Sequence, residues 1–433
     1  MRDLPLAVRG EGCWIYDDQG KPYLDAVGGA FVASLGHGVA DISDAMAAQA
    51  RQLAYVNGTQ FTNQPAERLA ADLAHRAPAD LELAYFLSSG SEAVEAALKL
   101  ARQYWVERGR REKVKVLSLT PGYHGNTLLA LSASGRPRYQ VYFHGWLIGV
   151  PRIPAPYAYR CECGGRSAIC EVCSGTGLEV AIMEEGPETV AAFIAEPVGG
   201  SSTGASLPGP EYWRQVRQIC DRHEVLWIAD EILAGAGRTG TWSALEPYGA
   251  VPDLMTLGKG ITGGYAPLSA VLAPRRIIDV LAQGSGSLLH AQTFSHHPVA
   301  CSAGLAALEY LDRHDLVTRS ALMGELLHQQ LLPLREFPIV GDIRGRGLLA
   351  GIELVADRDS RRPIPRSERF AERFAQAAMD AGLVVWPNTG HANGVDGDLI
   401  MLAPPFVITE AEIDEIVTRL VATLRQLSQP IRG

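Results

Sequence analysis

The middle of the chain alternates short apolar runs with long amphipathic stretches, and no other feature narrows the possible folds as much. Strands are expected at residues 83–87, 114–119, 190–195, 225–229, 254–257 and 268–272. Helices are expected at residues 91–108, 210–223 and 299–311. Because strands that alternate with helices form parallel sheets, the pattern predicts an α/β fold around a mostly parallel sheet.

The two ends of the chain show a different pattern. The elements expected there are a hairpin near residues 14–25, a helix near 41–53, a helix over 317–335, a strand over 347–355, and helices near 367–381 and from 409. We therefore expect a large domain over residues 51–314 and a small α+β domain to which residues 1–50 and 315–433 both contribute.

Composition and charge exclude several classes of protein. The 433 residues are 47% hydrophobic and 20% charged, which is ordinary for a globular protein and excludes disorder as the main state. The net charge of −9 argues against a protein that coats nucleic-acid phosphates. No apolar stretch reaches the roughly 18 residues of a membrane helix, and the N-terminus lacks a signal-peptide core. We therefore expect a cytoplasmic protein that binds neither nucleic acid nor membranes.

A turn of serines and glycine, Ser88-Ser89-Gly90-Ser91, separates an expected strand from a strong helix. Hydroxyls and free backbone N–H groups at a helix N-terminus can bind a phosphate, because the donors and the helix dipole point the same way. The same residues also fit a simple helix cap, in which Ser89 is the N-cap and Glu92 its capping-box partner.

The acidic pair Asp230-Glu231 ends an apolar run, at the place where open α/β sheets bind their ligands. Taken alone, the pair also fits a helix cap or a Mg²⁺ site. The segment Gly235–Gly240 formally matches G-x-G-x-x-G, but that dinucleotide motif must follow its strand directly and open a helix. Four residues separate the segment from Asp230, so the dinucleotide interpretation is rejected.

Lys259 lies between two glycines directly after an apolar run. A Walker phosphate loop would need Gly at 253 and Ser or Thr at 260, whereas the chain has Asp253 and Gly260. A lysine in a tight turn can approach a bound carbonyl closely, and partial burial would lower its pKa and free its amine to form an imine. In isolation, a surface lysine in a glycine turn is the simpler interpretation.

Together and in this order, a phosphate-binding turn, a strand-end aspartate and a turn lysine resemble the pyridoxal-phosphate enzymes of fold type I. The details are similar to the class III aminotransferases, also called the omega-aminotransferase family. The matching motifs are Ser89-Gly90-Ser91-Glu92-Ala93, Gly122-Tyr123-His124-Gly125, Glu196-Pro197, Asp230-Glu231, Gly258-Lys259-Gly260, Thr293-Phe294-Ser295, Arg344–Leu348 and Ala403-Pro404-Pro405. The resemblance implies a large domain built on a mostly parallel seven-stranded sheet.

The resemblance also implies roles for individual residues. Lys259 would hold pyridoxal phosphate as an imine and then move protons as the general base. Asp230 would pair with the pyridine nitrogen and keep it protonated, which makes the ring an electron sink. Ile232 would pack behind the ring, and Tyr123 would stack over its other face with His124 beside it.

Further roles concern the phosphate group and the second subunit. Ser89, Gly90 and Ser91 would take the phosphate at the helix N-terminus. A threonine that matches Thr293 reaches the phosphate from the neighbouring subunit in this family, so the resemblance implies a homodimer. Glu196 matches a family position near the floor of the active site.

The implied reaction is transamination in two half-reactions, in which an amine donor passes its amino group to a keto acid or aldehyde. A decarboxylase, racemase or aminomutase of the same fold is the nearest alternative, because the same electron sink serves all of them. An alternative of another class is a catalytically dead, zinc-stabilised binding module. The presence of both Lys259 and Asp230 argues against it.

The donor is suggested by an absent arginine. Several relatives that act on α-amino acids carry an arginine just before the C-terminal Pro-Pro, where it pairs with the substrate carboxylate. Met401 and Leu402 stand there in this chain, and Phe31 matches a substrate-pocket position of the omega group. We therefore expect a primary amine or an omega-amino acid as donor and a keto acid such as pyruvate as acceptor. Other residues that could pair with a carboxylate are Arg136, Arg138, Arg346 and His391.

A cysteine-rich insert over residues 160–177 departs from the family pattern. Its cysteines, Cys161, Cys163, Cys170 and Cys173, follow the spacing C-x-C-x₆-C-x₂-C. Four thiolates in turn-rich loops can satisfy tetrahedral zinc. The first gap is only one residue, however, and the implied reaction needs no metal. The sequence therefore favours free thiols or an oxidised pair over zinc and leaves both open.

Overall fold

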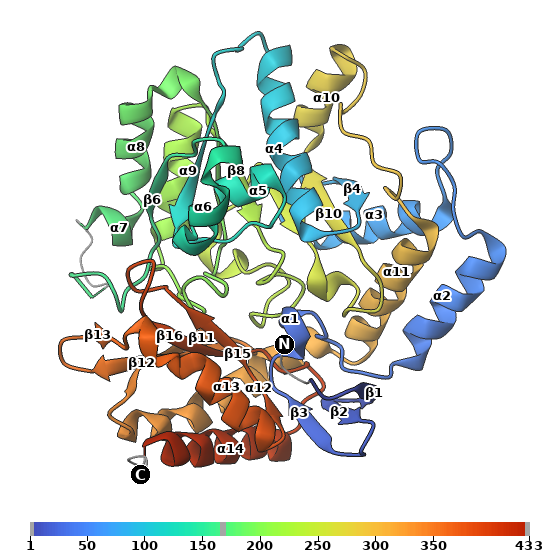
Figure 1. The fold of residues 1–433 in the computed structure, drawn as a ribbon. Helices are drawn as coiled ribbons and strands as arrows, with labels where there is room; N and C mark the ends of the chain where they lie inside the picture. The colour runs from blue at the N-terminus through green and yellow to red at the C-terminus, as the bar shows by residue number, and fades with distance from the viewer. Residues whose placement is uncertain (1–3, 165–169, 429–433) are drawn as a thin grey trace.

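The computed structural model describes residues 4–164 and 170–428. Its largest sheet has the strand order β4-β10-β9-β8-β7-β5-β6 and lies in the upper part of the molecule in Figure 1. The strands are β4 (Leu83–Leu87), β5 (Lys115–Thr120), β6 (Arg152–Pro154), β7 (Val190–Ala195), β8 (Leu226–Asp230), β9 (Leu254–Leu257) and β10 (Ser269–Ala273). Only β10 runs antiparallel to its neighbours. The predicted α/β fold with a mostly parallel seven-stranded sheet is confirmed.

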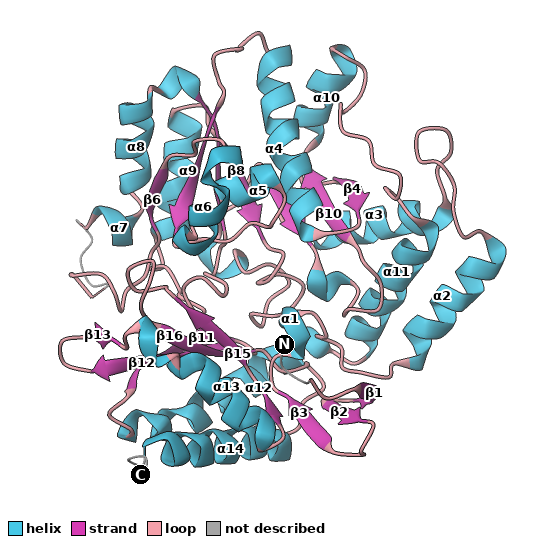
Figure 2. Ribbon diagram, in the orientation of Figure 1, coloured by secondary structure: helices cyan, strands magenta, loops and turns pink. Residues whose placement is uncertain are grey.

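Helices cover both faces of this sheet (Figure 2). The α-helices within the described residues are α1 (Gly28–Phe31), α2 (Ala40–Gln52), α3 (Gln64–Arg76), α4 (Gly90–Glu107), α5 (Leu128–Ala133), α6 (Pro137–Phe143), α7 (Glu171–Ser174), α8 (Gly177–Glu185), α9 (Tyr212–Arg222), α10 (Arg275–Gln283), α11 (Pro298–Arg313), α12 (Leu316–Leu331), α13 (Phe370–Asp380) and α14 (Glu410–Ser428). No helix within the described residues is long and apolar enough to span a membrane.

Strand β7 shows why the apolar runs were recognisable in the sequence. All six of its residues are buried, because successive side chains point to opposite faces and both faces are covered. Ala192 and Ile194 pack with α4 on one side, whereas Phe193 and Ala195 pack with α9 on the other. A strand buried on both faces therefore reads as an unbroken apolar run.

Two further sheets lie in the lower part of the molecule (Figure 1). One has the order β1-β2-β3-β14 and the other the order β11-β12-β16-β15, with β13 paired to β12. Their strands are β1 (Ala7–Glu11), β2 (Trp14–Asp17), β3 (Pro22–Asp25), β11 (Val340–Arg346), β12 (Leu349–Asp357), β13 (Arg362–Pro363), β14 (Leu383–Val384), β15 (Trp386–Thr389) and β16 (Asp398–Leu402). Parallel pairing of β3 with β14 joins the two ends of the chain. The domain boundaries near residues 50 and 314 stay a prediction.

Some element bounds differ from the expectation. The helix expected over residues 317–335 ends as α12 at Leu331 and continues as a 3-10 helix over Leu332–Glu336. Pro333 is the reason, since proline has no N–H for the next α-helical hydrogen bond.

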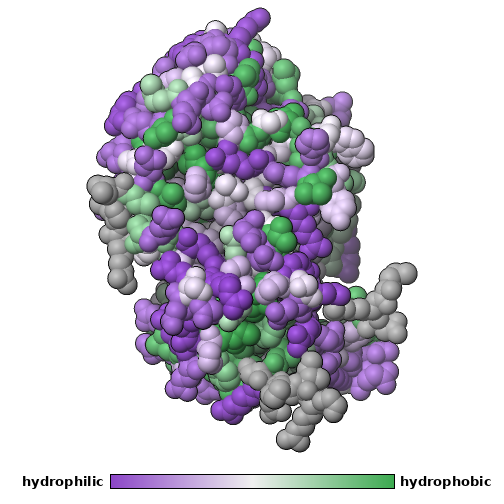
Figure 3. Space-filling view, turned by 60° about the vertical axis from the view of Figure 1, so that its left-hand side comes forward, coloured by the Kyte–Doolittle hydropathy of each residue, from purple (hydrophilic) through white to green (hydrophobic). Residues whose placement is uncertain are grey.

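On the face turned forward in Figure 3, hydrophilic side chains predominate and hydrophobic ones are scattered between them.

Candidate active site

Lys259 lies in a sharp turn at the carboxyl end of β9. It opens a 3-10 turn and has a φ of 44°, in the left-handed region that few non-glycine residues adopt. Gly258 packs tightly beside it, because a Cβ there would lie 3.3 Å from the Ile232 side chain. The Lys259 Nζ atom lies 5.4 Å from the centroid of the Phe31 ring. The lysine is thus held in a close-packed turn and not on an open surface.

Asp230 ends the neighbouring strand β8 and is 4% exposed. Its Oδ2 atom accepts a hydrogen bond of 2.7 Å from His124 Nδ1. Its Oδ1 atom accepts bonds from the Ile232 N–H at 3.2 Å and the Thr256 hydroxyl at 3.3 Å. Three hydrogen-bond donors therefore surround this buried carboxylate. The His124 Nε2 atom is buried and has no hydrogen-bond partner among the described residues. Since buried polar atoms normally have a partner, this nitrogen is available for a hydrogen bond at the site.

The electrostatic surroundings shift the pKa of the site lysine. Burial lowers the pKa of Lys259 to about 8, although the carboxylates of Asp230 and Glu196 act in the opposite direction. Burial and the charge of Asp230 raise the pKa of Glu196. A lysine amine with this pKa is partly neutral near pH 8 and can act as a nucleophile or base.

This pKa predicts how cofactor-free protein combines with pyridoxal phosphate. The second-order rate constant should rise with pH and level off above a midpoint near pH 8, because only the neutral Lys259 amine attacks a carbonyl. Stopped-flow absorbance between pH 6.5 and 9.5 measures the profile. A rate constant that still rises about tenfold per pH unit up to pH 9.5, as the ordinary lysine pKa of 10.5 requires, would contradict the prediction.

The serine turn forms a capping box at the start of α4. The Glu92 N–H donates to the Ser89 hydroxyl at 3.3 Å, and a Glu92 carboxylate oxygen accepts from the Ser89 N–H at 2.9 Å. The helix-cap interpretation of this segment is therefore correct for Ser89. The box leaves the first-turn N–H groups of Gly90 and Ser91 available to an anion. A Cβ at Gly90 would lie 3.0 Å from the Ile232 side chain, so Ile232 packs directly against this turn.

Glu196 and Arg136 frame Tyr123. Glu196 accepts hydrogen bonds from the N–H groups of Tyr123 at 3.1 Å and of Gly200 at 3.0 Å. The guanidinium of Arg136 lies 4.8 Å from the centroid of the Tyr123 ring and donates to the Ser202 hydroxyl at 3.2 Å. Of the four carboxylate-binding candidates from the sequence, Arg136 is the one in contact with a predicted site residue.

Two aromatic rings form a wall next to the lysine. Phe31 is 4% exposed, and the centroid of its ring lies 5.4 Å from that of Trp386. Met401 and Leu402 are fully buried in β16, and Met401 packs in the same apolar cluster as Phe31. Apolar side chains therefore fill the region behind the wall.

A cavity of about 480 Å³ opens beside this wall. Trp386, Arg136, Arg138, Asn388 and His391 are among the residues that line it. Because Trp386 contacts Phe31 and Arg136 contacts Tyr123, the cavity is adjacent to the predicted cofactor residues.

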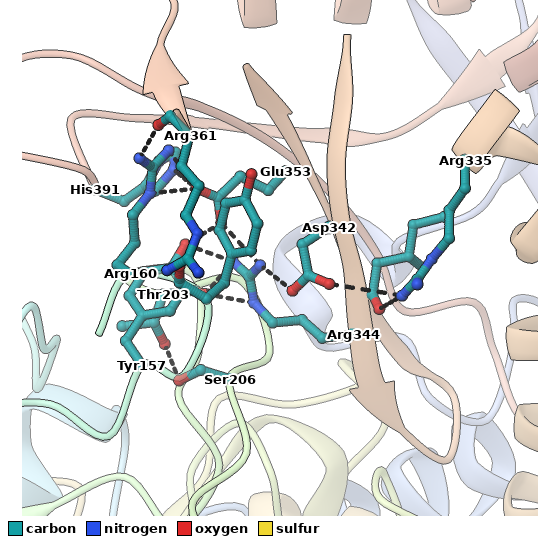
Figure 4. Close-up of polar contacts among 12 residues, drawn as sticks. Tyr157, Arg160, Thr203, Ser206, Arg335, Asp342, Arg344, Glu353, Arg361 and His391 are labelled. Carbon is teal, nitrogen blue, oxygen red and sulfur yellow. Dashed lines mark hydrogen bonds and ion pairs between the residues drawn. The ribbon is translucent and has the colours of Figure 1, made fainter. Parts of the chain in front are cut away.

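Other predicted residues are exposed or have different partners. Thr293 is exposed on the loop before α11. Arg346 donates to the Tyr248 hydroxyl at 3.0 Å. His391 Nε2 lies 3.2 Å from a carboxylate oxygen of Glu353, inside the polar network of Figure 4. Arg346 and His391 are therefore engaged by partners other than the predicted cofactor residues.

Sequence reasoning missed Thr256 and Trp386. Thr256 is paired with Asp230 in the register of β8 and β9, and its signal was a lone hydroxyl residue in an otherwise apolar, buried strand. Trp386 carried no local signal, since β15 reaches the site only through the tertiary fold.

A mostly parallel sheet that presents a buried aspartate and a turn lysine at neighbouring strand ends defines a pyridoxal-phosphate enzyme of fold type I. Residues 3–424 match the model of the family Aminotransferase class-III. An (S)-enantioselective omega-transaminase from Thermomicrobium roseum superposes with a TM-score of 0.93 and 35% identity, covering 99% of this chain and 94% of that one. The chain belongs to the class III aminotransferases, a family of pyridoxal-phosphate-dependent transaminases.

Curated relatives agree with this assignment. A putrescine–pyruvate aminotransferase of Pseudomonas aeruginosa is 34% identical and covers 95% of this chain and 89% of its own length. An adenosylmethionine-8-amino-7-oxononanoate aminotransferase of Geobacter sulfurreducens is 36% identical, with coverage of 98% and 92%. The predictions of family, fold class and enzyme class are confirmed.

Proposed function

We propose that this aminotransferase binds pyridoxal phosphate covalently through Lys259 and uses Asp230 to hold the pyridine nitrogen protonated. When bound, the cofactor supplies a carbonyl that exchanges amino groups and a ring that accepts electrons. The observation that carries the proposal is the pairing of Asp230 with His124 at a strand end next to Lys259, with the buried His124 Nε2 atom left without a partner among the described residues.

The start of α4 fits the phosphate of this cofactor. We assign the phosphate to the N–H groups of Gly90 and Ser91 and to the Ser89 hydroxyl, which can donate its proton outward while it accepts from Glu92. Ile232 and Tyr123 would enclose the ring, and Glu196 holds the Tyr123 backbone through a hydrogen bond. Lys259 would then move protons, because its lowered pKa suits a general base near neutral pH.

We propose a primary amine or omega-amino acid as donor. The wall of Phe31 and Trp386 next to the lysine is apolar, and Met401 and Leu402 offer no partner for a carboxylate near the reacting carbon. An unpaired carboxylate there would be costly to desolvate. The putrescine–pyruvate relative and the omega-transaminase structure support this donor class.

A keto acid such as pyruvate is the proposed acceptor, and Arg136 the cation that meets its carboxylate. Arg136 lines the cavity and stacks on Tyr123, so it can reach a small acid bound beside the lysine. Guanidinium groups bind carboxylates in a bidentate geometry.

A substrate panel tests the function. With pyruvate as acceptor, kcat/KM for short primary amines and omega-amino acids should exceed that for ordinary α-amino acids by at least about tenfold, the ratio that corresponds to about 1.4 kcal/mol of carboxylate desolvation. Product analysis of the same reactions separates transamination from decarboxylation or racemisation. A tenfold preference for α-amino acids with 2-oxoglutarate would overturn the donor class but leave the transaminase assignment intact.

We further propose a homodimer, with Thr293 of each subunit completing the phosphate site of the other. Thr293 is exposed in the single chain, and its neighbour Phe294 is 57% exposed and contacts Tyr55. An exposed apolar ring beside the threonine supports a contact surface there. A cytoplasmic location stays a prediction.

A further inference from the structure

The four clustered cysteines converge on one point, although residues 165–169 between them lie outside the described residues. Their Sγ atoms all lie within 4.8 Å of one another. Three separations are 3.3 Å for Cys161–Cys163, 3.6 Å for Cys161–Cys170 and 3.3 Å for Cys163–Cys173. Four sulfur atoms at tetrahedral corners, each about 2.3 Å from a zinc ion, would lie about 3.8 Å apart. The cluster already has nearly that size.

Two tight turns present the sulfur atoms toward each other. In the first, the Gly164 N–H donates to the Cys161 carbonyl at 2.9 Å. In the second, the Cys173 N–H donates to the Cys170 carbonyl at 3.0 Å, at the start of α7. Two cysteine-bearing turns that face each other bring the four thiols together without a long extended connection, which is a common way to build a closed metal site.

Other uses of four thiols fit this geometry less well. None of the four is in a disulfide, and separations of 3.3–3.6 Å far exceed the S–S bond of about 2.05 Å. An iron–sulfur cluster holds several irons and sulfides inside its ligand shell, so it would spread the cysteines farther apart than a single ion does. One small, thiophilic cation with tetrahedral preference matches best.

We propose that Cys161, Cys163, Cys170 and Cys173 bind one structural zinc ion per chain, and that this ion fixes the strap of residues 157–163 against β12. Four protein ligands leave no open coordination position, so the site is structural and not catalytic. This proposal is independent of the proposed transaminase chemistry.

The strap reaches the cavity wall through a buried carboxylate (Figure 4). Arg160 Nε donates to Glu353 Oε1 at 2.6 Å, and the Tyr157 hydroxyl donates to Glu353 Oε2. Glu353 Oε1 also lies 3.2 Å from Nε2 of His391, which lines the cavity. Arg344 pairs with the same carboxylate at 2.8 Å. Arginine charges around it keep the pKa of Glu353 well below its usual range.

The same strap is held from both sides. Arg361, beside β13, donates to the carbonyl oxygens of Tyr159 at 2.8 Å and Cys161 at 3.2 Å. On the other side, α7 leads directly into α8, whose Leu178 packs with Tyr212 of α9 against the seven-stranded sheet. A metal between the two turns would therefore link the helical layer of the large sheet to β12 and β13.

Metal analysis of the purified full-length holoenzyme tests the proposal. Protein made with zinc in the medium should contain about one zinc per chain, and a mercurial thiol reagent should release it stoichiometrically. Cys170→Ala and Cys173→Ala should each lower the zinc content at least tenfold and speed proteolytic cleavage of the strap. Cys301→Ala is the matched control, because Cys301 is buried in α11, outside the cluster, and should leave the zinc content unchanged.

Other outcomes would overturn the proposal. These are zinc-supplemented protein without metal, a mass lower by two hydrogens for each disulfide formed, iron in place of zinc, or zinc that persists in both cluster variants. If either variant fails to fold, reagent-driven release from the unaltered protein still decides the question, since the release needs no substitution.

Discussion

Replacing Lys259 with alanine lowers kcat by at least about 10³-fold and abolishes covalent attachment of pyridoxal phosphate. The expected loss combines nucleophilic and general-base contributions, each of which is worth orders of magnitude in rate. Activity assays give kcat, and mass spectrometry after borohydride reduction shows whether the cofactor stays on the chain.

The fold should survive this substitution. Lys259 sits in a turn, and its amine makes no hydrogen bond to any described residue, so Lys259→Ala should keep the unfolding midpoint within about 3 °C. Lys99→Ala is a suitable control, because Lys99 is exposed on α4 and should keep full activity. Near-native turnover in Lys259→Ala would show that another residue carries the cofactor.

Replacing Asp230 with asparagine should lower kcat by about 10²–10³-fold while cofactor remains bound. An opposite charge at hydrogen-bond distance shifts a pKa by about one to three units, and each unit corresponds to a tenfold change. Asparagine keeps the size of Asp230 and can still accept from His124, so the loss isolates the charge. Steady-state kinetics and the pH dependence of the cofactor's absorbance measure both effects.

Glu231 offers an internal control on the adjacent position. Burial raises the pKa of Glu231 to about 7, and its carboxyl group bonds with the Ser243 hydroxyl at 2.6 Å and the Ala244 N–H at 3.1 Å. Because this carboxyl is already half neutral near pH 7, Glu231→Gln should change kcat by less than about threefold. Equal losses in the two variants would show that packing, not the Asp230 charge, matters here.

The parts of the fold that could be predicted are those whose pattern is local. Strands β7 and β8 were recognisable because burial on both faces demands unbroken apolar runs. Strand β6 was missed because its three residues are too few to show a period. Helices α3 and α10 were not among the predicted elements, although their sequences are amphipathic. The helix near residue 317 was placed correctly at its start, but its end needed attention to Pro333.

The candidate site residues also differ in whether a local sequence pattern marks them. Lys259 and Asp230 were predicted from the sequence because each stands at or just after the end of an apolar run, which marks the ligand edge of such a sheet. The sequence could not rank the four carboxylate-binding candidates, because their contacts appear only in the fold. Arg136 lies against Tyr123, Arg138 lines the cavity, and Arg346 and His391 contact Tyr248 and Glu353. Contacts of this kind depend on tertiary packing, which a short sequence window does not contain.

The parallel pairing of β3 with β14 has a consequence for synthesis on the ribosome. Leu24 pairs in register with Leu383. Strand β3 is synthesised early, so it cannot form this pairing until β14 has been synthesised near the end of translation. Phe31 follows β3 and Trp386 follows β14, so the aromatic wall beside Lys259 forms only when both strands are in place. Nascent chains that stop before residue 383 therefore carry the lysine and the aspartate but lack half of the wall. Such non-local pairing forms slowly, so the candidate active site is completed late in the folding of each new chain.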